Sequence, residues 1–123
     1  MLLVKTTIGP SKIHGIGLFA TEFIAKGTMI WDLHAGFDLE LTIEQLNSLP
    51  EIARDTLMFY CYPDGKYFVI CLDDARHMNH SENPNTGNHE TGTIAIRDIH
   101  SGEEITCDYQ EVYDSTDHTG IVF

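Results

Sequence analysis

Two short polar segments hold the residues of this sequence that are best suited to chemistry. Residues 76–85 read RHMNHSENPN and bring an arginine, two histidines and three asparagines into ten positions. Residues 102–109 read GEEITCDY and end in Asp108 and Tyr109. The first segment is rich in hydrogen-bond donors that can hold a carboxylate or a base. The second offers a phenol that can position a reacting group.

A glycine-flanked turn precedes both segments. Gly15 and Gly17 enclose Ile16, and without side chains they let main-chain N–H and C=O groups approach a ligand closely. A tight turn that enters a strand would use the same glycines. The pattern disfavours a dinucleotide-binding loop, because a third glycine, a following helix and an acidic residue at the required spacing are absent.

The histidines raise the alternative of a metal site. His77, His80 and His89 lie within thirteen positions, but carboxylates or thiols at ligand spacing do not accompany them, so we predict no metal. The run Asn83-Pro84-Asn85 predicts a turn, which is compatible with a binding loop.

Short runs of β-forming residues, bounded by turn residues, predict a mostly-β fold. The expected strands cover residues 2–7, 16–20, 28–34, 66–71, 93–97 and 104–107, with turns at 25–27 and 62–66. Thr42 and Gln45 fit a capping box that starts a short helix. Pro50 suits the first turn of a second helix that ends near Phe59. The apolar residues expected on one face of this pair are Leu46, Leu49, Ile52, Ala53, Leu57 and Tyr60.

The bulk properties fit one domain over residues 1–123, which is enough chain for a single modest core. No apolar run reaches the length of a membrane span, and the N-terminal residues turn polar too early for a signal peptide. We therefore expect an intracellular protein, cytoplasmic in a bacterium and nuclear or cytoplasmic otherwise. Its three cysteines lack C-x-x-C spacing, which favours buried free thiols. The net charge of −12 disfavours direct nucleic-acid or membrane binding and favours basic partners, although solubility alone would also explain it.

Taken together, the motifs resemble those of one family. Residues 76–85 and 102–109 are similar to the paired motifs R-F-x-N-H-S-x-x-P-N and G-E-E-[IL]-x-x-D-Y of SET-domain protein-lysine methyltransferases. Residues 14–20, HGIGLFA, resemble the family's N-terminal G-x-G-[LV]-F-A motif. The resemblance spans residues 4–113. It implies a mostly-β (β+α) SET-domain fold of several short sheets, with a helical insert at 42–60 and a knot-like crossing of the two C-terminal motifs.

Two positions depart from the family pattern. His77 stands where the family usually has Phe, and Glu82 stands where many eukaryotic relatives have a zinc-binding cysteine. The chain therefore resembles the minimal bacterial and viral members, which lack zinc-binding pre- and post-SET modules. A homodimer that completes the site is compatible with such a minimal domain.

The resemblance implies S-adenosylmethionine as the cofactor. The turn of Gly15, Ile16 and Gly17 would contact the amino-acid end of the cofactor through main-chain atoms. Arg76, Asn79 and His80 would hold its carboxylate and adenine. In the family, the Asn-His pair acts largely through backbone bonds, while its side chains tie down the surrounding loops.

Methyl transfer to a lysine requires an amine that is neutral, aligned and desolvated. Free lysine has a pKa of about 10.4, and an apolar channel beside a cationic sulfur would lower that pKa. The protein must then supply positioning, which in SET enzymes falls to the tyrosine that matches Tyr109. A buried aromatic with its hydroxyl bound to backbone is the alternative reading. Glu103 and Glu104 would shape the active-site loop or face solvent, and Asp108 would be structural.

Aromatic walls suit a lysine channel, because ring faces accept both the aliphatic stem and a cation. We expect Tyr60 or Tyr62 to face the cofactor pocket and Tyr113 to close the channel, although core packing would use the same residues. The tail, residues 114–123, would be partly ordered. The expected function is S-adenosylmethionine-dependent methylation of a lysine in a histone or another basic, lysine-rich protein. The alternative is an inactive SET-fold adaptor that binds basic peptides.

Overall fold

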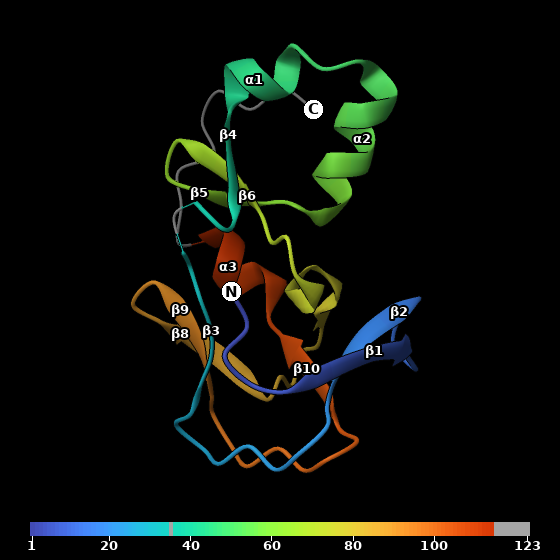
Figure 1. The fold of residues 1–123 in the computed structure, drawn as a ribbon, viewed down its shortest axis with the longest axis vertical. Helices are drawn as coiled ribbons and strands as arrows, with labels where there is room; N and C mark the ends of the chain where they lie inside the picture. The colour runs from blue at the N-terminus through green and yellow to red at the C-terminus, as the bar shows by residue number, and fades with distance from the viewer. Residues whose placement is uncertain (35, 115–123) are drawn as a thin grey trace.

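The computed structural model describes residues 1–34 and 36–114, and the side chains of these ranges up to residue 111. Within this part the chain forms three small sheets and three helices. One sheet has the order β1-β2-β10-β7, the second β3-β9-β8 and the third β4-β6-β5. Figure 1 shows two lobes, with α1 and α2 beside the third sheet at one end, the other two sheets at the opposite end, and α3 at the waist. The mostly-β fold of several short sheets is as expected from the resemblance.

The bounds of the elements show where the strand predictions succeeded. The strands are β1 Thr6–Pro10, β2 Ile16–Ala20, β3 Met29–Asp32, β4 Leu39–Thr42, β5 Tyr62–Asp64, β6 Tyr67–Ile70, β7 Asn79–His80, β8 Thr86–His89, β9 Gly92–Ala95 and β10 Glu104–Cys107. The bounds predicted for β2 and β10 are confirmed. The first strand was predicted too early, because Leu2 makes only an isolated bridge with Trp31 and regular pairing starts at Thr6. β4, β5, β7 and β8 were not predicted as strands.

The helical block follows its capping signals. Thr42 Oγ1 accepts from the Gln45 N–H at 3.1 Å and Gln45 Oε1 accepts from the Thr42 N–H at 2.9 Å, which confirms the capping box at the start of α1 (Ile43–Asn47). α2 spans Glu51–Tyr60, with Pro50 at its N-cap rather than inside its first turn. The placement of Ile52 on the packed face is wrong, since its side chain is 79% exposed. No helix in the described ranges is both long and apolar enough to cross a membrane.

Separate groups of apolar residues stabilise the two lobes. Leu18, Ile30, Ile99 and Ile105 belong to the core of the strand lobe, which comprises the first two sheets. In the helical lobe, which comprises α1, α2 and the third sheet, the core residues are Leu46, Cys61, Phe68 and Ile70. Burial of these side chains supplies the main driving force of folding. A third group consists of Trp31 from β3, Cys71 just after β6 and Ala75 from the 3₁₀ turn Asp74–His77.

The two C-terminal motifs cross each other around β10. Thr106 and Cys107 pair in parallel with Asn79 and His80. The side chain of Asn85 donates to the Glu104 carbonyl at 2.8 Å and accepts from the Thr106 N–H at 2.9 Å. Asn85 is 2% exposed, so these bonds satisfy polar groups that water does not reach. The loop from residue 79 to 86 therefore holds β10 through main-chain and side-chain bonds, and it places the end of β10 beside His80.

Candidate functional site

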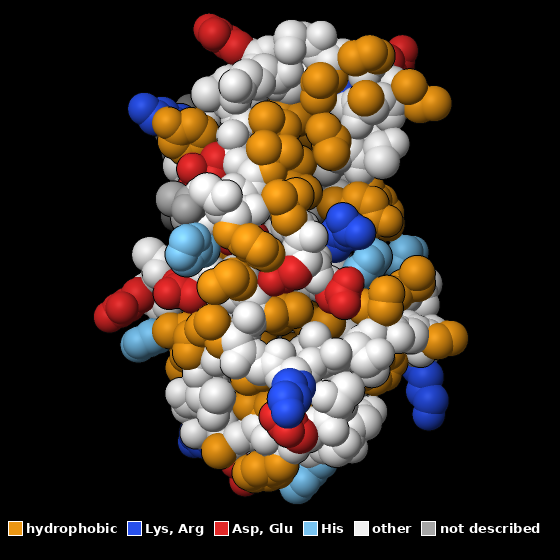
Figure 2. Space-filling view, in the orientation of Figure 1, with side chains coloured by type: hydrophobic (Ala, Val, Ile, Leu, Met, Phe, Trp, Pro, Cys, Tyr) orange, Lys and Arg blue, Asp and Glu red, His pale blue; other side chains and the backbone are white. Residues whose placement is uncertain are grey.

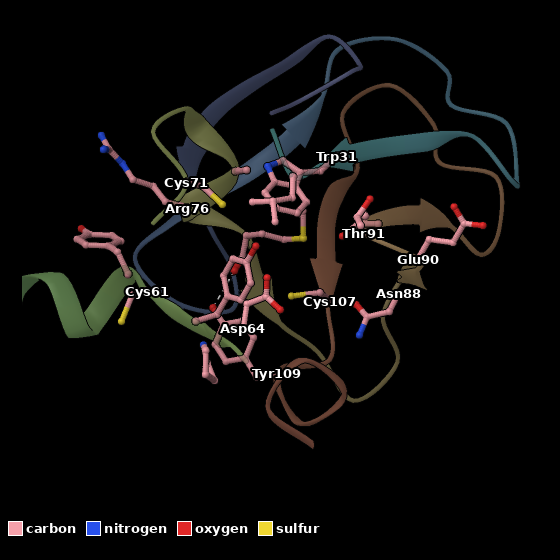
Figure 3. Close-up of a pocket in the computed structure, with 18 of the residues that line it drawn as sticks. Trp31, Cys61, Asp64, Cys71, Arg76, Asn88, Glu90, Thr91, Cys107 and Tyr109 are labelled. Atoms are coloured by element: carbon pink, nitrogen blue, oxygen red, sulfur yellow. Dashed lines mark hydrogen bonds between the residues drawn. The ribbon is translucent and has the colours of Figure 1, made fainter. Parts of the chain in front are cut away.

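A cavity of ≈ 390 Å³ opens between the two lobes (Figure 3). Its lining includes the aromatic residues Trp31, Tyr60, Tyr62 and Tyr109. These residues come from β3, the end of α2, the start of β5 and the start of α3, so the cavity exists only because the lobes meet there. On the face shown in Figure 2, apolar side chains gather along the helical lobe and at the waist, with acidic side chains among them. Pockets of this size with apolar walls and few polar groups are typical ligand sites.

Tyr109 places an oxygen in the wall of this cavity. Its hydroxyl donates to the carbonyl oxygen of Met78 at 2.7 Å, and both residues line the cavity. The Tyr109 N–H donates to His80 Nδ1 at 3.0 Å, and the two rings lie 5.4 Å apart. Tyr109 is 42% exposed, so it is not a buried core aromatic, although its hydroxyl does bind backbone. The crossing of the motifs thus fixes a phenol beside a main-chain carbonyl.

His80 and Asp108 fix the start of α3 (Tyr109–Asp114). Because His80 Nδ1 accepts a hydrogen bond, the hydrogen-bond network assigns the neutral ring's proton to Nε2. Asp108 Oδ1 accepts from the Gln110 N–H at 2.9 Å, as an acidic residue does before a helix. Both side chains therefore hold the main chain at Tyr109 in place through hydrogen bonds to N–H groups at the start of α3.

The Asn79 side chain is occupied by protein groups. Its Nδ2 lies 3.0 Å from the His14 carbonyl, 3.2 Å from the Ile16 carbonyl and 3.0 Å from Glu104 Oε2. Asn79 is 8% exposed. The Nδ2 group therefore connects residues of the glycine turn to Glu104 of the second C-terminal motif.

Gly17 makes room for Glu104. A Cβ at Gly17 would lie 2.7 Å from Glu104 Oε2 and 3.0 Å from Ser11 Cβ, which no side chain tolerates without a shift. Gly15 has a positive φ of 46° and open space where a Cβ would stand. Glycine is therefore needed at residue 17 because Glu104 packs against it. At residue 15 it allows the left-handed backbone of the turn. The open space beside the turn lies at Gly15.

Sequence reasoning missed Ser11. Its hydroxyl donates to the Glu104 carboxylate, with oxygen distances of 2.7 and 2.9 Å, and accepts from the Ile13 N–H at 2.9 Å. A serine that accepts from an amide two residues later is a recognised turn signal. It does not predict a hydrogen bond to Glu104, which is 93 positions away. Glu104 is consequently a bridge between Ser11 and Asn79 and not a solvent-facing carboxylate.

Arg76 lies at one edge of the cavity beside a row of rings. Its guanidinium is 5.9 Å from the centre of the Tyr60 ring, a distance typical of a cation–π contact. Tyr60 packs edge-on against Phe59 at 5.0 Å and against His77 at 5.9 Å, and His14 lies 6.2 Å from Phe59. Arg76 is exposed, so its charge is accessible to an anion. The structure therefore places a cation and flat ring faces next to the glycine turn.

Tyr60 and Tyr62 both line the cavity, whereas the side chain of Tyr113 lies outside the described residues. Tyr62 packs edge-on against Trp31 at 6.1 Å. Burial raises the pKa of its phenol, and nearby Cys71 and carboxylates raise it further, so Tyr62 stays neutral at physiological pH. The row of rings places Tyr60 on the Arg76 side of the cavity and Tyr62 on the Trp31 side.

The three cysteines are free and contribute to the same cavity wall. Burial raises the pKa of Cys61 to about 11 and that of both Cys71 and Cys107 to about 12. The thiols are therefore protonated at neutral pH and act as small apolar groups rather than nucleophiles. No group of three or more His, Cys, Asp or Glu residues is arranged to hold a metal ion within the described ranges.

A family model for the SET domain matches residues 15–110, which contain both C-terminal motifs and residues 15–20 of the N-terminal one. The chain belongs to the SET-domain family. Among solved structures, a Plasmodium falciparum protein provisionally named a histone methyltransferase has a TM-score of 0.62 at 24% identity, covering 88% of this chain and 95% of its own. A humanized mutant of the Chaetomium thermophilum Polycomb Repressive Complex 2, bound to an inhibitor, has a TM-score of 0.65 at 22% identity, covering 89% of this chain and 15% of its own. At these identities the two structures support the SET fold alone. No curated protein matches the sequence.

Proposed function

We propose that this SET domain transfers a methyl group from S-adenosylmethionine to the side-chain amine of a lysine in a basic protein. The observation that carries the proposal is the pair of oxygens from Tyr109 and Met78, 2.7 Å apart in the wall of an aromatic cavity. Membership of the SET family and the net charge of −12, which attracts basic partners, support it. An intracellular location and a homodimer stay predictions.

The residues beside the glycine turn fit the cofactor. S-adenosylmethionine carries a carboxylate, a flat adenine and a methyl group on a positively charged sulfur. The exposed guanidinium of Arg76 suits the carboxylate, and the open space at Gly15 gives access to the main chain of the turn. The rings of His14, Phe59 and Tyr60 offer faces for the adenine. Asn79 would contribute through its main chain, because its side-chain Nδ2 is already bonded within the protein.

Tyr109 and Met78 would orient the reacting amine. An amine beside them can donate its N–H bonds to the phenol oxygen and to the carbonyl oxygen, which turns its lone pair away from both. The lysine must lose a proton to water before that lone pair can form a bond to the methyl carbon, which would break the carbon–sulfur bond and leave the sulfur as a neutral thioether. The apolar walls favour this loss, because desolvation destabilises the ammonium form. The described residues would thus orient the amine and exclude water from it, rather than supply a strong base.

Calorimetry and a methylation assay test the proposal together. We expect the wild type to bind S-adenosylmethionine and to transfer radiolabelled methyl groups to a mixture of histones or lysine-rich peptides. Tyr109→Phe should keep the binding and lose most of the transfer. Cofactor binding without transfer to any basic substrate, or no binding even in the presence of lysine-rich peptide, would instead favour an adaptor that binds basic peptides.

A further inference from the structure

Two hydrogen bonds connect Tyr109 with the short segment of residues 78–80. Its N–H donates to His80 Nδ1 at 3.0 Å, and its hydroxyl donates to the Met78 carbonyl at 2.7 Å. Met78 and Tyr109 line the cavity, whereas His80 is not among the described residues that do so. The His80 side chain therefore acts on the cavity through Tyr109.

The bond from the Tyr109 N–H requires an unprotonated nitrogen on His80. Nδ1 of a neutral imidazole accepts when the ring proton is on Nε2, whereas both nitrogens of an imidazolium are donors. Protonation of His80 would thus place two N–H groups, which repel each other, at the present distance of 3.0 Å. The His80 side chain is 41% exposed, so solvent protons reach it. Histidine is also the side chain that ordinarily changes its charge between pH 5 and 8. A change of pH can therefore break this hydrogen bond.

Asp108 offers a partner for the protonated ring. Its Oδ1 lies 3.7 Å from His80 Nδ1, the nitrogen that now accepts from the Tyr109 N–H. The same oxygen accepts from the Gln110 N–H at 2.9 Å, in the first turn of α3. An imidazolium at His80 would attract this carboxylate and lose Tyr109, so one contact at the start of α3 would replace another. The exchange displaces the main chain of Tyr109 from its present position.

The other ionisable groups on the elements packed against His80 do not compete for it. Cys107 of β10 pairs with His80, and burial raises the pKa of its thiol to about 12, so the thiol stays protonated. The carboxylate of Glu111 is bonded to a main-chain N–H of β8. The phenol of Tyr109 is bonded to a main-chain carbonyl. Among the described residues, Asp108 is the carboxylate in ion-pair contact with His80.

We propose that His80 is a pH-sensitive positioning residue: the neutral ring holds the main chain of Tyr109 beside the cavity, and the protonated ring releases it and pairs with Asp108. The step is the transfer of one proton from solvent to Nδ1. The inference rests on the proposed function in one respect, because an effect on methyl transfer follows only if Tyr109 orients the amine. Acid pH would then slow transfer by displacing Tyr109, in addition to protonating the substrate's lysine.

Two substitutions at residue 80 separate the hydrogen bond from the titration. In His80→Asn, Oδ1 is bonded to Cγ as Nδ1 is in histidine, so it can accept from the Tyr109 N–H without a titratable ring. In His80→Leu no acceptor remains at any pH. His100→Asn is the matched control, because it makes the same change at an exposed histidine whose ring packs against Phe23 at 5.5 Å.

Nuclear magnetic resonance measures the bond without any need for activity. Amide hydrogen exchange at Tyr109, corrected for the intrinsic effect of pH, would be followed between pH 5 and 8 together with the nitrogen shifts of the His80 ring. We expect Nδ1 to be the unprotonated nitrogen of the neutral ring. Protection of the Tyr109 amide should fall about three- to tenfold as the ring protonates, the range for the loss of one hydrogen bond.

The variants give the matching expectations. His80→Asn should keep the protection of the Tyr109 amide at both ends of the pH range, and His80→Leu should lack it at both. His100→Asn should respond to pH as the wild type does. The same pH response in the wild type and in His80→Asn would overturn the inference. A His80 ring that stays neutral throughout, or an amide that stays protected when the ring protonates, would also overturn it.

Methyl transfer tests the consequence separately. The substrate's lysine also titrates, so the ratio of the wild-type rate to the His80→Asn rate at each pH removes its contribution. We expect this ratio to fall at acid pH. A pH-dependent Tyr109 amide in a protein that transfers no methyl group at any pH would support the switch and reject the methyltransferase. Transfer with the same ratio at every pH would support the enzyme and overturn the switch.

Discussion

The carboxylate of Glu104 occupies the place that a side chain at residue 17 would need, since Glu104 Oε2 is 2.7 Å from the Cβ position of Gly17. The same carboxylate accepts from the Ser11 hydroxyl and from Asn79 Nδ2. One group therefore connects the glycine turn, the loop of residues 76–85 and β10. The three motifs are far apart in the sequence, but residues from each of them meet at this carboxylate.

Replacing Gly17 by alanine should destabilise the fold. The new methyl group would collide with Glu104 and Ser11, and overpacking of this kind costs about 1–3 kcal/mol. Gly9→Ala is the control on the neighbouring strand, because its Cβ would meet only Phe19 at 3.9 Å, an ordinary contact. Urea denaturation of both variants measures the difference. If Gly17→Ala proved as stable as Gly9→Ala, the close approach of Glu104 would not be a packing constraint.

Replacing Asn79 by aspartate should make stability depend strongly on pH. The variant would put a second carboxylate about 3 Å from Glu104 Oε2, where Asn79 Nδ2 now lies at 3.0 Å. Like charges this close raise a carboxyl pKa in the folded state. A raised folded pKa contributes stability below the unfolded value and loses it as pH rises through the folded value. Asn79→Asp should therefore gain stability, relative to wild type, when pH falls from 7 to about 4. A pH-independent difference in urea midpoint between the two proteins would contradict this expectation.

Removing the Tyr109 hydroxyl should separate binding from reaction. Tyr109→Phe deletes the hydrogen bond from the hydroxyl to the Met78 carbonyl, at a residue that is 42% exposed, so the loss of that bond should cost about 1 kcal/mol. If the hydroxyl orients the amine, methyl transfer should fall about a hundredfold or more, because misaligned reactants lose the advantage of proximity. Thermal unfolding, cofactor affinity and single-turnover transfer would be measured on the same preparation. Unchanged transfer in Tyr109→Phe would remove this residue from the mechanism.

The sequence predicted β2 and β10 with their observed bounds because local and tertiary preferences agree there. Leu18 and Ile105 are both fully buried, and the strands that carry them are paired with each other. The capping box at Thr42 was predictable for a similar reason, since its partners are three residues apart. Family motifs added the crossing of residues 79–86 with β10, which no local pattern reveals.

The remaining features depend on contacts that are distant in sequence. β8 contains Gly87 and Asn88, residues that are depleted in strands. It exists because it pairs with β9 and because the Thr86 hydroxyl donates to the Thr106 carbonyl. Ser11 and Glu104 are 93 positions apart, so their bond could not be read from spacing. The exposure of Ile52 was missed because an apolar residue at helical spacing is usually packed, and nothing in the sequence marks the open face of α2.

The raised pKa values of the thiols predict a loss of stability at alkaline pH. Cys71 and Cys107 have pKa values of about 12, raised by burial from a reference of 9.0. Their contribution is fully present below pH 9 and is lost as pH rises toward 12, because the unfolded chain releases these protons first. Urea midpoints measured between pH 8 and 10.5 should therefore fall. The urea midpoint of Cys107→Ser should fall less steeply with pH than that of the wild type. If the two midpoints changed in parallel with pH, the Cys107 thiol would not contribute to the alkaline loss of stability.

Removing the charge of Arg76 should weaken cofactor binding without unfolding the protein. The guanidinium is exposed and contacts the Tyr60 ring at 5.9 Å, an interaction of about 0.5–1 kcal/mol at such sites. A charge-assisted bond to the cofactor's carboxylate would contribute more, about 1.5–3 kcal/mol, so Arg76→Gln should weaken binding at least tenfold. Arg76→Lys should recover only part of the affinity, because an ammonium cannot form the two parallel bonds of a guanidinium. Lys26→Gln removes the same charge elsewhere on the surface and controls for the net charge of −12. Equal affinities of Arg76→Gln and Lys26→Gln in calorimetry would place the carboxylate of the cofactor away from Arg76.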